Sequence, residues 1–346
     1  MDHNASSSIF GWHFQINSAI VYFIKYIKDI KSIRIEGKDE DIELLLFNEK
    51  KILIQAKSYS KLGKDSKALK KLETGLNTLF LGAQKNEIDK LIYTTNFPNP
   101  IGGKSSQHHI FMGDGIIERT FNEIPANYKK KVVEIIEKLS EKYNKKYNTD
   151  ILNISVINFD GEDYETRYRT ILRIIREFLS NISVNPVYSK KLLEIWQSEF
   201  LFNATTSNVS IDLTKNQVIW PIIVINSQLL EDDKNFEKLI DEFQMDEEEI
   251  EIVLYKYTTF IDKQSEKFSF VMKVNSDYEI YRKNKIGNER GIKSFINDKW
   301  TDYIYLVNTD KIEEEVKQII VKIILFKILN LKTMVKKLKK EVKLEI

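Results

Sequence analysis

The segment from Arg34 to Ser58, RIEGKDEDIELLLFNEKKILIQAKS, constrains the fold of this chain most strongly. It holds two apolar runs on either side of the polar sequence NEKK, which is the pattern of two strands joined by a turn. The second run, Ile52-Leu53-Ile54, continues directly into Gln55 and Lys57. Because side chains alternate between the two faces of a strand, Gln55 and Lys57 share one face. A hairpin that only filled a core would not need this polar end.

The surrounding pattern predicts an α/β domain. The expected elements are, in order, a helix over 11–30, strands over 32–36, 41–47 and 51–57, a helix over 66–84, a strand over 90–96, a helix over 126–148, a strand over 151–159 and a helix over 164–183. The central strands are apolar at nearly every position, so we expect them to be buried on both faces.

The pattern changes after Pro186, which stands in the predicted hinge SVNPVYS. We therefore expect an α/β domain over 1–183 and a mainly helical (α or α+β) domain over 187–346, with a regulatory or partner-docking role. Its expected helices cover 189–202, 235–243, 247–258, 311–331 and the basic C-terminal segment, and WTDYIYLV predicts a strand.

Composition limits the possible functions. The formal net charge is only +2, so any surface that binds phosphate groups must be local. The chain has no cysteine, which excludes disulfides and thiolate metal sites and leads us to expect a cytoplasmic protein. No run of about eighteen uninterrupted apolar residues predicts a membrane span.

The hairpin predicts a metal site at one of its ends. Asp41 opens the first strand, and pairing of the two strands brings it beside Gln55 and Lys57. Oxygen ligands from Asp41, the Gln55 side chain and the Ala56 carbonyl suit Mg²⁺ or Mn²⁺, with Lys57 stabilising an attacking hydroxide and phosphorane charge. Glu36 could add a ligand. Asp39 also precedes the strand, but Asp41 is favoured because it adjoins the apolar run.

These motifs resemble a known nuclease superfamily. Asp41 followed by Gln55-Ala56-Lys57 after an amphipathic helix is similar to the QxK variant of the PD-(D/E)xK nucleases, which is associated with Mrr-like restriction enzymes. FGWHFQINSAIVYFI, RIEGKDEDIEL and ILIQAKS together resemble the nuclease domain of bacterial antiphage effectors, namely the double-stranded-DNA endonuclease of CBASS systems and the nuclease subunit of Lamassu systems. The resemblance covers roughly the first hundred residues.

The resemblance implies a role for each matching residue. The residues that it places in the catalytic site are Gln15, Glu36, Asp41, Gln55 and Lys57, with Glu36, Asp41 and Gln55 at the metal. The chain departs from the superfamily pattern at Glu40, which stands where the namesake proline would be, and at Gln55, which replaces an acid. The second change leaves the number of metal ions open.

The chain is therefore expected to be a metal-dependent double-stranded-DNA endonuclease that is inactive until a partner or assembly triggers it. The resemblance implies an SMC-like or other ATPase partner, or a nucleotide second messenger, and a homo-oligomer in the active state. Two alternatives stay open, namely a non-catalytic DNA-binding or assembly module and an Mrr-like restriction enzyme for modified DNA. Candidate DNA contacts are Lys61, Lys64, Lys104 and Ser105, which lie in polar loops.

Overall fold

The computed structural model describes residues 6–60, 67–102, 109–227, 247–262, 268–287, 291–307 and 313–344. The chain divides into two compact units. The first consists of Met1–Ser180 and Asn185–Val218, and the second of Asn181–Val184 and Ile219–Ile346. The candidate site lies in the first unit.

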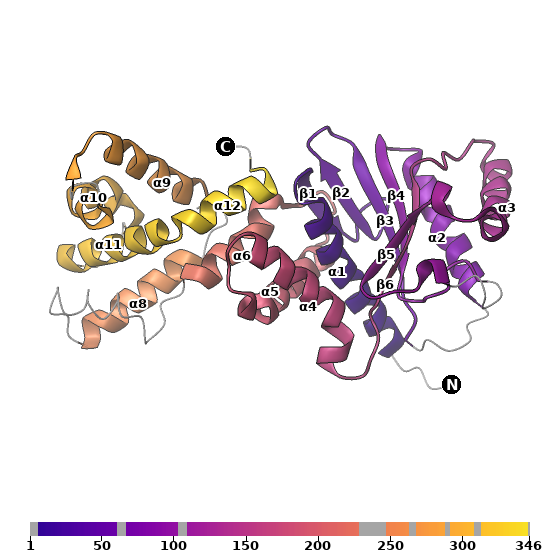
Figure 1. The fold of residues 1–346 in the computed structure, drawn as a ribbon, viewed down its shortest axis with the longest axis horizontal. Helices are drawn as coiled ribbons and strands as arrows, with labels where there is room; N and C mark the ends of the chain where they lie inside the picture. The colour runs from indigo at the N-terminus through magenta and orange to yellow at the C-terminus, as the bar shows by residue number, and fades with distance from the viewer. Residues whose placement is uncertain are drawn as a thin grey trace. The chain divides into compact units, whose positions relative to one another are not determined.

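A seven-stranded mixed sheet forms the centre of the first unit, with strand order β5-β6-β4-β3-β2-β1-β7 (Figure 1). Its strands are β1 (Ile30–Ile35), β2 (Ile42–Leu46), β3 (Lys51–Lys57), β4 (Ile88–Thr95), β5 (Ile116–Thr120), β6 (Leu152–Ile157) and β7 (Leu213–Thr214). The prediction of an α/β fold is thus confirmed, and β5 and β7 are additions to the predicted strands.

The pairing of the first three strands matches the predicted meander. Strands β1, β2 and β3 are antiparallel, and the β2–β3 register places Ile42 opposite Ile54 and Glu43 opposite Leu53. Strand β4 then runs parallel to β3, and β6 runs parallel to β4. A parallel neighbour needs a crossover connection, and α2 supplies it between β3 and β4.

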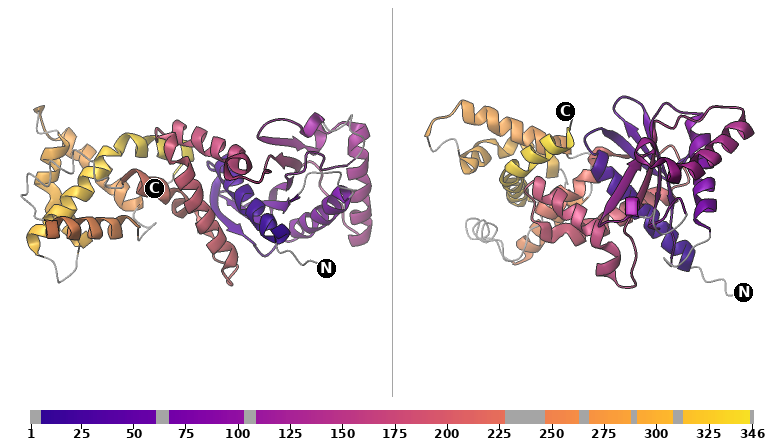
Figure 2. Two further views of the ribbon diagram at one scale, coloured as in Figure 1. Left: turned by 90° about the horizontal axis from the view of Figure 1, so that it is seen from below. Right: turned by 45° about the vertical axis from the view of Figure 1, so that its right-hand side comes forward.

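Helices cover both faces of this sheet (Figures 1 and 2). The helices of the first unit are α1 (Ser6–Tyr26), α2 (Ala68–Ala83), α3 (Ala126–Tyr143), α4 (Tyr164–Asn181) and α5 (Ser189–Thr205), with short 3-10 helices η2 (Phe121–Glu123) and η3 (Pro186–Tyr188). Leu53 packs in one core cluster with residues of α2 and α3. Its strand neighbour Ile54 is equally inaccessible to solvent on the other face. The expected burial of the central strands on both faces is therefore confirmed.

The chain passes between the units more than once, because the second unit takes Asn181–Val184, next to the predicted boundary at 183–187, and then everything from Ile219. Residues 185–218 belong to the first unit because α5 packs against α1, where Phe23 contacts Trp196 and Phe200 edge-on. In addition, the Asn203 side chain accepts a hydrogen bond from the main chain of Ile35 in β1, at 3.0 Å. Pro186 thus lies at the start of the segment that belongs to the first unit again after Asn181–Val184.

The described part of the second unit is helical, as predicted. Its elements are the greater part of α6 (Lys215–Ser227), together with α8 (Glu247–Asp262), α9 (Phe268–Lys283), α10 (Ile292–Lys299), the 3-10 helix η6 (Trp300–Val307), α11 (Glu314–Asn330) and α12 (Lys332–Val342). Helix α11 is central, because it contacts α8, α9, α10 and η6. None of the helices in the described ranges is long and apolar enough to cross a membrane.

One predicted strand is wrong. WTDYIYLV forms η6, in which the buried Tyr303 packs its ring against Phe270 and Phe295 and donates a hydrogen bond to Asp277 at 2.6 Å. Packing of one ring among α9 and α10 favours a helical turn over the strand that alternation indicated. Helices α9 and α10 were not predicted, and the predicted helix over 235–243 lies outside the described residues.

Candidate functional site

The end of the β2–β3 hairpin gathers the three residues that the sequence analysis placed together. The Gln55 amide donates a hydrogen bond to Asp41 Oδ2, and the main-chain N–H of Ala56 donates to the same oxygen at 3.0 Å. Lys57 Nζ lies 3.7 Å from Asp41 Oδ2. All of these contacts fall on Oδ2 of a side chain that stays 22% exposed. These three contacts therefore orient the Asp41 carboxylate.

Gln15 and Glu36 approach this cluster from a second direction. Gln15 Nε2, on the buried face of α1, donates to Glu36 Oε1 at 2.7 Å and to the main-chain oxygen of Asp41 at 3.0 Å. That same oxygen accepts from the main-chain N–H of Glu36 at 2.8 Å, which closes the turn before β2. Glu36 has a φ of 52°, in the left-handed region. Gln15 thus fixes the turn that presents Asp41.

Helix α2 contributes a residue that the sequence analysis did not single out. Thr78 donates a hydrogen bond from Oγ1 to the Gln55 side-chain carbonyl. The helix approaches closely because Gly75, one turn earlier, has no side chain: a Cβ there would lie 2.6 Å from the Tyr93 ring and 3.2 Å from Cγ of Gln55. The pair Gly75 and Thr78, three residues apart on a helix face, was the available sequence signal.

Burial raises the pKa of Asp41, against the opposing effects of the Lys57 charge and of hydrogen bonds from Ala56, Gln55 and Lys57. Its neighbour Glu40 is only 6% exposed. Burial, followed by the charge of Asp41, raises the pKa of Glu40 to about 8. Two adjacent buried carboxylates are costly when both are charged, and a cation would lower that cost.

The donor set fits a hard divalent cation. Mg²⁺ and Mn²⁺ bind oxygen ligands, which Asp41, Glu40 and the Gln55 carbonyl can supply. The Gln55 amide nitrogen faces Asp41 and the carbonyl faces Thr78, so the carbonyl would reach an ion held by Asp41 after rotation of the amide. Oε1 of Glu40 is buried and has no hydrogen-bond partner among the described residues. The described residues contain no group of three or more histidine, cysteine or acidic side chains that could hold a metal ion. The candidate site around Asp41 differs from such a cluster because the amide of Gln55 stands where an acid would be.

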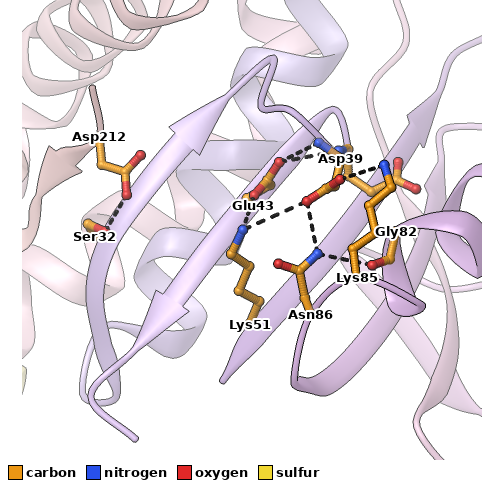
Figure 3. A network of polar contacts seen from close by, with 9 residues as sticks. Ser32, Asp39, Glu43, Lys51, Gly82, Lys85, Asn86 and Asp212 are labelled. Atoms are coloured by element: carbon orange, nitrogen blue, oxygen red, sulfur yellow. Dashed lines mark hydrogen bonds and ion pairs between the residues drawn. The ribbon is translucent and has the colours of Figure 1, made fainter. Parts of the chain in front are cut away.

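Asp39 belongs to a separate polar network (Figure 3). It accepts hydrogen bonds from Lys85 at 3.0 Å and Asn86 at 2.8 Å, and its main-chain N–H donates to Glu43 at 2.8 Å. Burial raises the pKa of Asp39, but hydrogen bonds from Asn86 and Lys85 and the charges of Lys85 and Lys51 outweigh it and lower the pKa. Asp39 thus fastens the β2 turn to the end of α2. Asp41 is the acid that faces Gln55 and Lys57.

The predicted DNA contacts Lys61, Lys64, Lys104 and Ser105 lie outside the described residues. A further cation stands at the exit from β3. Lys71 Nζ on α2 donates to the main-chain oxygen of Ser58 at 2.8 Å and lies 3.5 Å from the centre of the Tyr59 ring. It holds the segment that follows Lys57 against α2.

No protein-family model and no curated protein matches this sequence. Among solved structures, the chain is similar to the Moraxella osloensis Cap4 SAVED/CARF-domain containing receptor, with a TM-score of 0.35 and 14% sequence identity. The match covers 62% of this chain and 47% of the receptor chain, so this chain spans about half the length of that receptor. The functional assignment therefore rests on the geometry of the site.

Proposed function

We propose that this chain is a metal-dependent endonuclease acting on double-stranded DNA, with a restriction-endonuclease-like first unit. The observation that carries the proposal is the convergence of Asp41, Gln55 and Lys57 at one end of the β2–β3 hairpin. The order of helix, three-stranded meander, helix and parallel strand supports the same assignment. A carboxylate, a neutral oxygen donor and an ammonium group in contact are suited to phosphodiester hydrolysis.

Each side chain then has a defined task. Asp41 and Gln55 would hold Mg²⁺ or Mn²⁺, which would supply a Lewis acid and would lower the pKa of a water molecule. The Lys57 ammonium, 3.7 Å from Asp41, stabilises the negative charge that develops on the phosphorus oxygens. Gln15 positions Asp41 by holding its main-chain oxygen, and it also orients Glu36. Glu36 supports the metal from the turn.

The biological role that we propose is that of a regulated effector in bacterial antiphage defence. A nuclease with no sequence restriction would cut the chromosome of its own host, so its activity must depend on a trigger. We assign the control to the helical second unit, through an ATPase partner, a nucleotide second messenger or self-assembly. Cleavage of both DNA strands needs two active sites, which a homo-oligomer supplies.

Cleavage of plasmid and linear double-stranded DNA by the purified full-length chain, assembled through an oligomerising tag, tests this function. We expect cleavage with Mg²⁺ or Mn²⁺, loss of cleavage with EDTA and loss in Lys57→Ala. Lys31→Ala is the matched control, because Lys31 is an exposed lysine of β1 that pairs with Glu49 at 2.7 Å, outside the site. Equal cleavage by wild type and Lys57→Ala would refute the proposed site.

A further inference from the structure

We propose that Glu40 is a ligand of the divalent cation and supplies the second carboxylate that Gln55 does not provide. This inference rests on the proposed function. Gln55 is a neutral amide, so Asp41 and Gln55 together bring one negative charge to a doubly charged ion, and the carboxylate of Glu36 already accepts a hydrogen bond from Gln15 at 2.7 Å. Glu40 precedes Asp41 in the chain and brings the missing charge.

The environment of Glu40 supports this role. Its side chain is 6% exposed, and its Oε1 has no hydrogen-bond partner in the described ranges. Its neighbours are the Asp41 carboxylate, the Lys57 ammonium and the Thr78 hydroxyl. The hydroxyl of Thr78 also donates to the Gln55 carbonyl, so Thr78 lies between the two side chains. Glu40 is therefore part of the same cluster as Asp41 and Gln55.

The Glu40 side chain is buried, and its Oε1 has no hydrogen-bond partner among the described residues. A carboxylate removed from water costs several kcal/mol unless charge or hydrogen bonds compensate for it. Lys57 lies near Glu40, but the contact that the structure gives it is with Asp41, at 3.7 Å. A divalent cation between Asp41 and Glu40 would compensate both carboxylates at once.

A purely structural role for Glu40 would involve Tyr147 instead. The hydroxyl of Tyr147 is also buried and has no partner among the described residues, and Glu40 is its acidic neighbour. A hydrogen bond between the two, direct or through a water molecule, would satisfy both groups without a metal. Tyr147→Phe removes that possibility and leaves the acid in place, so it is the matched control variant.

Binding of Mn²⁺ to the full-length protein, measured from the electron paramagnetic resonance signal of the free ion, tests the inference without relying on activity. We expect Glu40→Gln to weaken Mn²⁺ binding at least about tenfold and Tyr147→Phe to leave it within about twofold. Glu40→Asp keeps the charge and should fall between wild type and Glu40→Gln. It also carries the test if Glu40→Gln does not fold, because a shorter acid with unchanged affinity would refute ligation.

Asp41→Asn separates failure of this inference from failure of the proposed function. If wild type binds Mn²⁺ and Asp41→Asn does not, while Glu40→Gln binds like wild type, then Glu40 is not a ligand and the nuclease site stands without it. If wild type and Asp41→Asn bind Mn²⁺ equally, or neither binds it, the metal site itself is wrong and both proposals fail.

Discussion

The Gln55 side chain donates a hydrogen bond to the Asp41 carboxylate across 14 residues of sequence. The β2–β3 register makes this contact possible, because it pairs the residue after Asp41 with the residue before Gln55. An acid at position 55 would repel Asp41 in the metal-free protein, whereas the amide binds it. The neutral residue therefore holds the Asp41 carboxylate in place in the metal-free protein, while its own carbonyl accepts a hydrogen bond from Thr78.

Thr78 should control the orientation of Gln55. Thr78→Val keeps the shape of the side chain but removes the hydroxyl that donates to the Gln55 carbonyl. We expect DNA cleavage to fall roughly 10- to 100-fold, as for other residues that orient a metal ligand. Thr74→Val is the control, because Thr74 is an exposed residue of the same helix whose Oγ1 donates to the main-chain oxygen of Lys70, at 2.9 Å. Equal rates for the two variants would argue against a positioning role for Thr78.

Gly75 should be needed for the close approach of α2 to the sheet. Gly75→Ala places a methyl group 2.6 Å from the Tyr93 ring, a fully buried side chain in β4. Overpacking of this kind lowers the free energy of unfolding by about 1–3 kcal/mol. Denaturant unfolding of Gly75→Ala and Gly11→Ala provides the comparison, since a Cβ at Gly11 would meet Ser58 at an ordinary 3.6 Å. A stabilised Gly75→Ala would contradict the packing described for α2.

The free energy of unfolding should fall as pH rises, because Glu40 is harder to deprotonate in the folded protein than in the unfolded chain. Its pKa is raised to about 8 from an ordinary 4.5, so between these values the folded protein retains a proton that the unfolded chain releases. The free energy of unfolding therefore decreases as pH rises through this window, on the order of 1 kcal/mol per pH unit from this group, and levels off above it.

Denaturant unfolding of wild type and Glu40→Gln in chelating buffer, from pH of about 5 to about 8, measures this linkage. Glu40→Gln removes both this group and its repulsion with Asp41, so the difference between the two proteins reports Glu40 together with its coupling to Asp41. Glu40→Gln should become progressively more stable relative to wild type as pH rises. A relative gain by the wild type would show that Glu40 is charged in the folded protein throughout this window.

Substitution of Asp39 should lower stability without changing Mn²⁺ affinity, whereas substitution of Asp41 should abolish Mn²⁺ binding. Asp39→Asn weakens the contacts with Lys85 and Lys51 and should cost about 1 kcal/mol of stability, less at high salt, because Lys85 is largely exposed. Its Mn²⁺ affinity should stay within about twofold of wild type. Asp41→Asn should lose Mn²⁺ binding. Melting curves measure the stability of both variants, and Mn²⁺ titrations measure their affinity for the ion. Loss of Mn²⁺ binding in Asp39→Asn but not in Asp41→Asn would show that Asp39 is the ligand.

Local pattern predicted the hairpin well because its strands pair with close neighbours in sequence. The strand expected over 51–57 has those limits in the structure, and Gln55 and Lys57 meet Asp41 as expected. The limits of β3 follow from its apolar run, which is buried on both faces. In this part of the chain, local and tertiary preferences agree.

Three features could not be predicted, because they depend on contacts between residues that are far apart in the sequence: the roles of Thr78 and Gly75, the 3-10 helix η6 and the attachment of α5. Thr78 and Gly75 reach Gln55 from a helix whose exact rotation against the sheet is set by packing. The alternation around Tyr303 indicated a strand, but the aromatic contacts of that ring are made in a 3-10 helix. The attachment of α5 to the first unit depends on long-range contacts such as that between Phe23 and Trp196.

The central claim is that the site around Asp41 hydrolyses DNA with a bound metal ion. It is tested most directly by DNA cleavage with Mn²⁺ when the full-length chain is fused to an oligomerising tag, beside the same fusion of Lys57→Ala and a size measurement of each. We predict cleavage by the assembled wild type and none by the assembled variant. An assembled wild-type protein that leaves DNA intact, or a Lys57→Ala fusion that cuts as well as the wild type, would contradict the nuclease assignment.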